Sequence, residues 1–178
     1  MKLAILSDTH GLLRPEVTEH LKTADAILHG GDINRQSIVD ELRQYAPLYI
    51  VRGNNDKDWA EAIPHDLTVT LGGVTFFMVH NRKEVPADLA GVDAVVFGHS
   101  HKYVQEEKDG VLWLNPGSCG PRRFHQEITM RRMGRSGWRR SSSPTGRREN
   151  GGKTASNRRF RRLRRRGGAP RAGEGTGH

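Results

Sequence analysis

The chain has 178 residues, of which 34% are hydrophobic and 28% are charged. This length is typical of one domain and supplies enough apolar sequence to bury a core. A single cysteine, Cys119, excludes an internal disulfide framework and is typical of a reducing compartment. The N-terminal sequence MKLAILSDTHG has too few consecutive apolar residues for a signal peptide. No later apolar stretch approaches the length of a membrane span. We therefore expect a soluble cytoplasmic protein with no membrane partner.

The net charge of +9 is concentrated at the C-terminal end of the chain. Residues 1–130 carry 13 Lys and Arg against 18 Asp and Glu, whereas residues 131–178 carry 16 against 2. Arg, Gly and Ser dominate that second segment, which cannot bury enough apolar surface to fold. We expect a globular domain over residues 1–130 and a disordered tail over residues 131–178.

Three explanations of the tail remain open. The preferred one is a frameshift, because an abrupt switch to Arg, Gly and Ser is what GC-rich DNA gives when it is read out of frame. The strand that begins at 126–130 would then leave one sheet edge incomplete. The second is a solvated tail. The third is an arm that binds nucleic acid through phosphate contacts, although only Trp138 and Phe160 could stack on bases.

Apolar runs alternate with amphipathic stretches in the first part of the chain. Strands are expected at 2–6, 26–28 and 48–51, with one helix from Pro15 and another through Ile38, Leu42 and Tyr45. Alternating runs at 67–71 and 74–79 flank a Gly-Gly pair and predict a hairpin. A strand at 94–97 and a second hairpin, 103–107 with 111–115, come next. This order predicts an α/β (α+β) fold with two mixed sheets packed face to face and helices outside.

Polar side chains follow successive predicted strands, at the edge where ligands bind in open α/β sheets. On an extended backbone, the two residues of Asp8-x-His10 point the same way, as do those of His99-x-His101. Any one of these residues could be a helix cap, a turn residue or a hydrogen-bonded core histidine. Their joint placement instead predicts a metal site, and the mixture of carboxylate, amide and imidazole groups without a thiolate suits Mn, Fe, Co, Ni or Zn rather than Ca or Mg. The candidate ligands are Asp8, His10, Asp32, Asn54, His80, His99 and His101.

Five ordered motifs and a lone His80 after a strand carry a resemblance to a known family. The motifs are SDTHG (7–11), GGD (30–32), GNND (53–56), GHSH (98–101) and NPGS (115–118). Over about the first 120 residues the chain resembles calcineurin-like metallophosphoesterases, and most of all their small bacterial and archaeal phosphodiesterases. The resemblance implies a four-layer αββα sandwich of two mixed β-sheets flanked by helices.

The resemblance also implies two divalent transition-metal ions, Mn²⁺ first, with Ni²⁺, Co²⁺, Fe²⁺ or Zn²⁺ as alternatives. Asp8, His10 and His101 would hold one ion, Asp32 would bridge, and Asn54, His80 and His99 would complete the other. A hydroxide shared by the two metals would attack a small phosphodiester in line. Asp32, Asn54 and His80 would act in catalysis through that hydroxide.

One departure bears on substrate choice. Asn55 stands where many larger relatives have a histidine thought to protonate the leaving group, and an amide cannot do so at ordinary pH. The sequence therefore favours substrates with good leaving groups, such as activated or cyclic diesters. His29, just before the GGD motif, is expected to support a metal ligand.

Two other functions remain open. A retromer component of eukaryotes shares this fold and binds partners without turning over substrate, so a metal-binding scaffold is one alternative. Replaced ligands would favour it, whereas all seven are present here. Nucleic-acid binding through the tail is the other alternative, and homo-oligomerisation also remains open.

Overall fold

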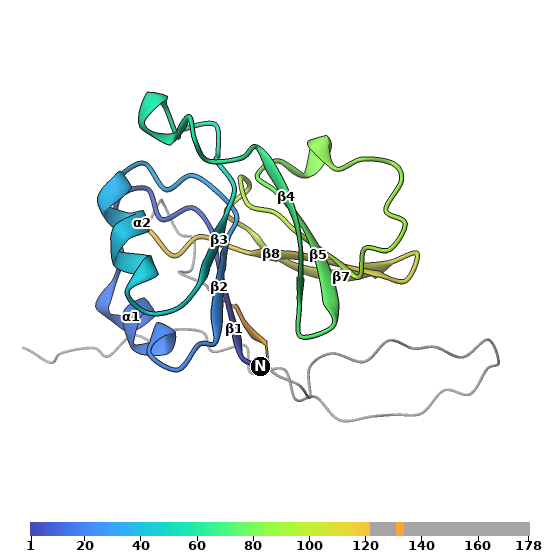
Figure 1. Ribbon diagram of the computed structural model, residues 1–178. Coiled ribbons are helices and arrows are strands. Elements are labelled where there is room, and N and C mark those ends of the chain that lie inside the picture. Colours follow the sequence, from blue (N-terminus) through green and yellow to red (C-terminus); the bar gives the residue numbers. More distant parts are fainter. Residues whose placement is uncertain (122–130, 134–178) are drawn as a thin grey trace, which may run out of the picture.

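The computed structural model describes residues 1–121 and 131–133, which form two β-sheets packed face to face (Figure 1). The first sheet has the order β3-β2-β1-β9 and the second the order β4-β5-β6-β8-β7. The first contains β1 (Leu3–Leu6), β2 (Ala26–His29), β3 (Leu48–Ile50) and β9 (Arg131–Met133). The second contains β4 (Asp66–Leu71), β5 (Val74–Val79), β6 (Ala94–Val96), β7 (Tyr103–Lys108) and β8 (Val111–Pro116). Both sheets mix parallel and antiparallel pairs.

Two α-helices cover the outer face of the first sheet (Figure 1). Helix α1 (Pro15–Leu21) begins at its proline, whose missing N–H costs nothing at a helix start. Helix α2 (Gln36–Arg43) turns Ile38, Val39 and Leu42 toward the sheet, and Tyr45, expected on this helix, follows its end. No helix in the described part of the chain is long and apolar enough to cross a membrane.

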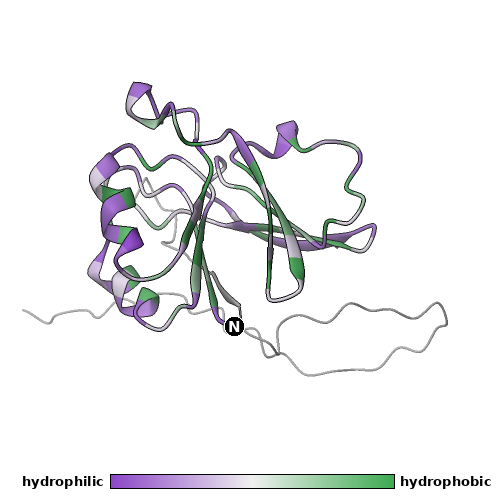
Figure 2. Cartoon of the chain, viewed as in Figure 1, coloured by the Kyte–Doolittle hydropathy of each residue, from purple (hydrophilic) through white to green (hydrophobic). Residues whose placement is uncertain are grey.

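The central strand β1 is buried on both faces, as its continuous apolar sequence predicts. Because side chains alternate along a strand, Leu3 and Ile5 join the core between the sheets, whereas Ala4 and Leu6 join the core beneath the helices. Figure 2 accordingly shows hydrophobic residues along the strands of this sheet. The two cores hold the ends of β1 and β2 in place.

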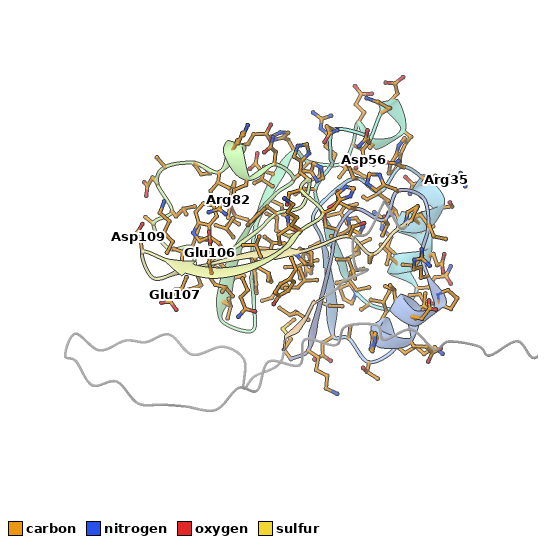
Figure 3. All side chains as sticks on the ribbon, turned by 180° about the vertical axis from the view of Figure 1, so that it is seen from behind. Arg35, Asp56, Arg82, Glu106, Glu107 and Asp109 are labelled. Carbon is orange, nitrogen blue, oxygen red and sulfur yellow. The ribbon has the colours of Figure 1, made fainter. Side chains whose placement is uncertain are left out.

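The fourth layer, on the outer face of the second sheet, is thin. It consists of the segment after β5, whose only regular element is the 3₁₀ turn η2 (Arg82–Glu84). Arg82 lies over the rings of Phe97 and Trp113, with its Cζ 5.5 Å and 5.0 Å from their centroids, and forms an ion pair with Glu106 of β7 (Figure 3). The two-sheet α/β class is confirmed, with a loop and one 3₁₀ turn in place of an α-helix on this side.

Strand β9 extends the first sheet beyond the expected domain boundary at residue 130. Its three residues pair antiparallel with β1, from Leu3↔Met133 to Ile5↔Arg131. The beginning of the strand expected at 126–130 and the rest of the expected tail, 134–178, lie outside the described residues.

Candidate metal centre

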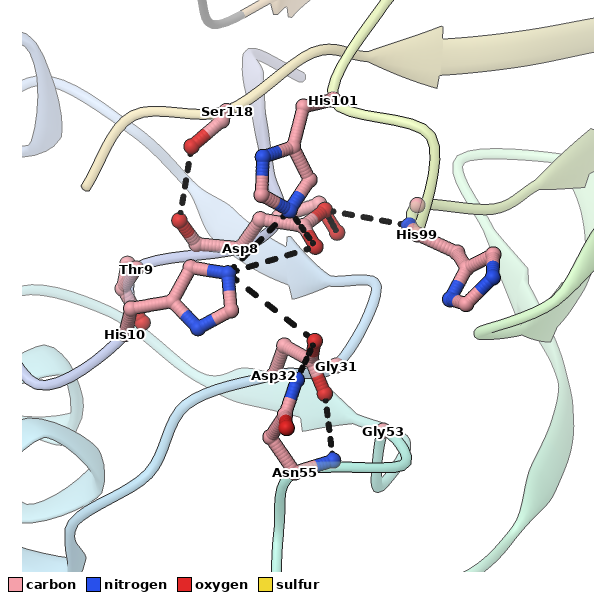
Figure 4. Close-up of polar contacts among 12 residues, drawn as sticks. Asp8, Thr9, His10, Gly31, Asp32, Gly53, Asn55, His99, His101 and Ser118 are labelled. Carbon is pink, nitrogen blue, oxygen red and sulfur yellow. Dashed lines mark hydrogen bonds and ion pairs between the residues drawn. The ribbon is translucent and has the colours of Figure 1, made fainter. Parts of the chain in front are cut away.

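The loops that follow β1, β2, β3 and β6 meet at one rim of the two sheets (Figure 4). The loop after β5 joins them through His80, whose Nδ1 is 2.7 Å from the Gly30 carbonyl. Backbone hydrogen bonds join them directly. The Asp8 N–H donates to the Gly31 carbonyl at 3.0 Å, and the Gly98 N–H donates to the His80 carbonyl at 3.0 Å. The second bond links loops of the second sheet, while the first links loops of the first sheet.

One group of side chains brings together ligand atoms from both sheets. Asp8, His10, Asp32 and His101 each offer one atom, and these atoms all lie within 4.8 Å of one another. His101 Nε2 lies 3.1 Å from Asp8 Oδ1 and 3.2 Å from His10 Nε2. When neither Nε2 carries a proton, the two nitrogens and the carboxylate oxygen lie close enough together to bind one cation.

A second group lies on the other side of Asp32. Asp32 Oδ2 is 3.4 Å from His80 Nε2 and 3.9 Å from His10 Nε2, so this oxygen lies between the two groups. The rings of His80 and His99 meet edge to face with centroids 5.3 Å apart, and His99 Nδ1 is 3.0 Å from Asn54 Oδ1. All seven candidate ligands are thus linked in one constellation.

Two buried atoms within this constellation have no hydrogen-bond partner, and both fit a metal ion. They are Asp8 Oδ1 and His80 Nε2. Leaving a buried polar atom unpaired costs about 1–3 kcal/mol, so such atoms need an explanation. His80 Nδ1 is 2.7 Å from the Gly30 carbonyl and donates to it, which leaves the lone pair of Nε2 facing the site. A bound cation would satisfy both atoms.

Asp32 and His80 each shift the pKa of the other. Burial pushes the pKa of Asp32 upward, but the neighbouring His80 and the Asn55 donors outweigh burial and hold that pKa well below its ordinary value. Burial lowers the pKa of His80, and the Asp32 carboxylate outweighs it and raises that pKa. The carboxylate is therefore ionised, as a metal ligand must be.

The backbone at these ligands contradicts one expectation from sequence. Asp8 (φ 55°), His10 (φ 47°), His99 (φ 67°) and His101 (φ 56°) all adopt the left-handed conformation, and so does Asp32 (φ 57°). The expectation that each i, i+2 pair points one way on an extended backbone is therefore wrong. Residues other than glycine avoid this region, and strain of this kind clusters at functional sites. Tight loops, and not strand geometry, turn these side chains inward.

Comparison with known proteins shows the family of the chain. The family model for the calcineurin-like phosphoesterase superfamily domain matches residues 1–134. The chain belongs to this superfamily. A phosphodiesterase of Methanocaldococcus jannaschii is 30% identical over 141 residues, which cover 67% of this chain and 84% of that protein.

Solved structures share the fold of this phosphoesterase domain. That of an archaeal phosphodiesterase has a TM-score of 0.66 at 27% identity and covers 76% of this chain and 94% of that one. Vps29 of Chaetomium thermophilum has a TM-score of 0.66 at 20% identity, covering 75% and 82%, a likeness that shows the fold alone.

Supporting residues of the phosphoesterase site include one buried carboxylate to which the sequence assigned no role. Asp56 Oδ1 accepts from the backbone N–H groups of Ile33 and Asn34 at 2.9 and 2.6 Å, and its Oδ2 accepts from Gly53 N–H at 2.8 Å. These bonds tie the loop after β2 to the loop after β3, which carries Asn54. In the sequence, the feature that could have indicated this role was the acidic residue that ends the GNND motif.

The NPGS motif supports the histidine loop and Asp8. Asn115 Nδ2 donates to the Gly98 carbonyl at 2.7 Å and to Ser100 Oγ at 3.1 Å, and Ser118 Oγ donates to the Asp8 carbonyl at 2.9 Å. Ser7 Oγ donates to Asp8 Oδ2 at 2.6 Å, which leaves Oδ1 directed at the imidazoles. In the sequence, the supporting role of Asn115 was indicated by its position as a polar residue at the end of an apolar strand.

His10 has a neighbour that can fix its tautomer. Asn34 Nδ2 lies 3.4 Å from His10 Nδ1, while Asn34 Oδ1 is buried and has no hydrogen-bond partner. A 180° rotation of the carboxamide exchanges these two atoms. The rotation would let Asn34 Oδ1 accept a hydrogen bond from a protonated His10 Nδ1. His10 Nε2 would then remain as the ligand atom.

His29 connects two loops and makes no hydrogen bond to a ligand side chain. Its Nδ1 accepts from the Gly31 N–H at 3.1 Å, so the proton lies on Nε2, which is 3.1 Å from Thr9 Oγ1. His29 therefore links Thr9, the neighbour of Asp8, to Gly31, the neighbour of Asp32.

The metal-free protein should lose stability in acid because of His29. Burial lowers the pKa of His29 to about 4. Between about pH 6.5 and pH 4 the unfolded chain binds a proton that the folded protein excludes, so stability falls as pH falls through this window, by about 3 kcal/mol in total. Urea unfolding across this range should show a shallower pH dependence for His29→Gln than for the wild type. His65→Gln, at an exposed histidine, should keep the wild-type dependence, and parallel curves for all three proteins would refute the assignment.

Proposed function

We propose that this phosphoesterase domain is a metal-dependent phosphodiesterase that uses two divalent transition-metal ions. The observation that carries the proposal is the position of Asp32 Oδ2 between His10 Nε2 and His80 Nε2, 3.9 Å and 3.4 Å away. A carboxylate that faces two separate groups of nitrogen ligands is suited to bridging two cations. The unpartnered Asp8 Oδ1 and His80 Nε2 add support from each side of that bridge.

The chain supplies different donors for the two ions. Asp8, His10 and His101 would hold the first, Asp32 would bridge, and Asn54, His80 and His99 would complete the second. This oxygen and nitrogen set suits Mn²⁺ first, with Ni²⁺, Co²⁺, Fe²⁺ and Zn²⁺ as alternatives. The metals, when bound, would activate water as the nucleophile and neutralise charge on the phosphoryl group. Asn54 provides an oxygen without adding a second negative charge beside Asp32.

The proposed site would give little help to the departure of the leaving group. Asn55, at the position of the leaving-group acid of larger relatives, gives its backbone and side-chain N–H groups to Asp32 at 2.9 and 2.6 Å. An amide does not release a proton at ordinary pH, so the leaving oxygen would depart as an anion. Activated or cyclic phosphodiesters should therefore be better substrates than alkyl monoesters.

Hydrolysis of bis(p-nitrophenyl) phosphate by metal-stripped protein tests the proposal. We expect no activity without metal and recovery when Mn²⁺ is added, with Ni²⁺, Co²⁺ and Zn²⁺ compared separately and Mg²⁺ as the poorly matched ion. Metal should bind at two equivalents per chain by calorimetry. A folded protein that binds metal yet hydrolyses neither diesters nor monoesters would refute the enzyme and favour a metal-binding scaffold.

A further inference from the structure

Asn55 makes two hydrogen bonds to the same carboxylate. Its backbone N–H donates to Asp32 Oδ1 at 2.9 Å, and its Nδ2 donates to Asp32 Oδ2 at 2.6 Å (Figure 4). The terminal torsion of an Asp side chain is broad, so a single hydrogen bond leaves the carboxylate free to turn. Two donors from one residue fix the plane of the carboxylate.

The side-chain bond is made to the oxygen that matters for bridging. Oδ2 is the Asp32 oxygen that faces His80 Nε2 and His10 Nε2, whereas Oδ1 faces the Asn55 backbone. The carboxamide therefore acts on the oxygen between the two groups of ligands. The backbone N–H alone, which any residue except proline would supply, does not reach that oxygen.

We infer that Asn55 is a positioning residue that holds Asp32 in its bridging orientation before metal binds. The inference rests on the proposed two-metal site and assigns a task to the residue that replaces the leaving-group acid. A neutral donor suits the task, because a carboxylate at this position would repel Asp32 and an apolar side chain would release Oδ2. Asn55 itself is exposed, so its side chain adds little to the core.

Removing only the carboxamide tests the inference. Asn55→Ala keeps the backbone donor, and we expect its affinity for the second Mn²⁺ to fall 10–100-fold in calorimetry, the usual effect of losing a hydrogen-bond partner of a metal ligand. Metal-free Asn55→Ala should unfold at a lower urea concentration than wild type, because the buried Asp32 carboxylate loses a donor, but it should remain folded under the conditions of the titration.

Asn81→Ala is the matched control. Asn81 also directly follows a candidate ligand, His80, but its Oδ1 accepts from the Lys83 N–H and contacts no ligand side chain. Its Mn²⁺ affinity should equal that of wild type. Electron paramagnetic resonance adds a readout besides affinity, because two Mn²⁺ ions that share a bridge give a coupled signal that isolated ions do not. We expect that signal in wild type and Asn81→Ala, and its loss in Asn55→Ala at the same metal concentration.

The outcomes separate this inference from the proposed function. A wild-type protein that binds a coupled Mn²⁺ pair, together with an Asn55→Ala protein that binds it equally well or more tightly, would overturn the positioning role and leave the two-metal site standing. A wild-type protein that binds no Mn²⁺ pair would overturn both.

Discussion

Replacing Asp32 with Asn should lower kcat/KM for bis(p-nitrophenyl) phosphate at least about 10³-fold, because the proposed bridge would contribute several kcal/mol of charge stabilisation. The substitution preserves size but removes the negative charge that lies between His10 and His80. Two cations held without that charge would repel each other, so the variant should also bind fewer than two Mn²⁺ per chain. Steady-state kinetics at saturating Mn²⁺ and calorimetry measure the two effects.

Asp109→Asn provides the control for this substitution. Asp109 lies in the exposed turn between β7 and β8 with φ 52°, a conformation that asparagine also tolerates. Its activity and metal stoichiometry should match those of wild type. If Asp32→Asn retained most of the activity while remaining folded, Asp32 could not be the bridging ligand.

The sequence could predict where the ligands gather because the strands carry them there. Leu6 of β1 pairs with His29 of β2 in a parallel register, so the residues after both strands leave the sheet at the same level. Asp8 and Asp32 come shortly after those partners and reach the same rim. Hydrophobic runs fix such strands, and the strand ends then fix the approximate position of the loop residues next to them.

Contacts between loops could not be predicted in the same way. The bonds from Asn55 to Asp32, and from the loop backbones to Asp56, join residues that periodicity does not relate. The left-handed backbone of His10 and His101 is equally hidden, because neither residue is a glycine. The sequence thus predicted which residues gather at this rim, whereas the loop conformations depend on nonlocal packing.

The close contact between the loops after β2 and β3 should make Gly53 irreplaceable. A Cβ at Gly53 would collide with the Oδ1 and backbone N of Asp32 and lie 2.8 Å from its Cγ. Gly53 N–H also donates to Asp56 Oδ2 at 2.8 Å, so the backbone cannot simply move aside. We expect Gly53→Ala to cost about 1–3 kcal/mol in the free energy of unfolding and to displace the Asp32 carboxylate, with loss of the second metal and of diester hydrolysis.

Gly73→Ala separates the loss of stability from the loss of the site. Nothing lies within 4 Å of a Cβ at Gly73, but its φ of 82° should cost about 1 kcal/mol once a side chain is present. This variant should therefore be destabilised in urea unfolding yet bind two Mn²⁺ and remain active. Normal metal binding by Gly53→Ala would mean that Asp32 can shift without consequence. Since a bridge must face both ligand groups at once, that result would contradict a rigidly held bridging carboxylate.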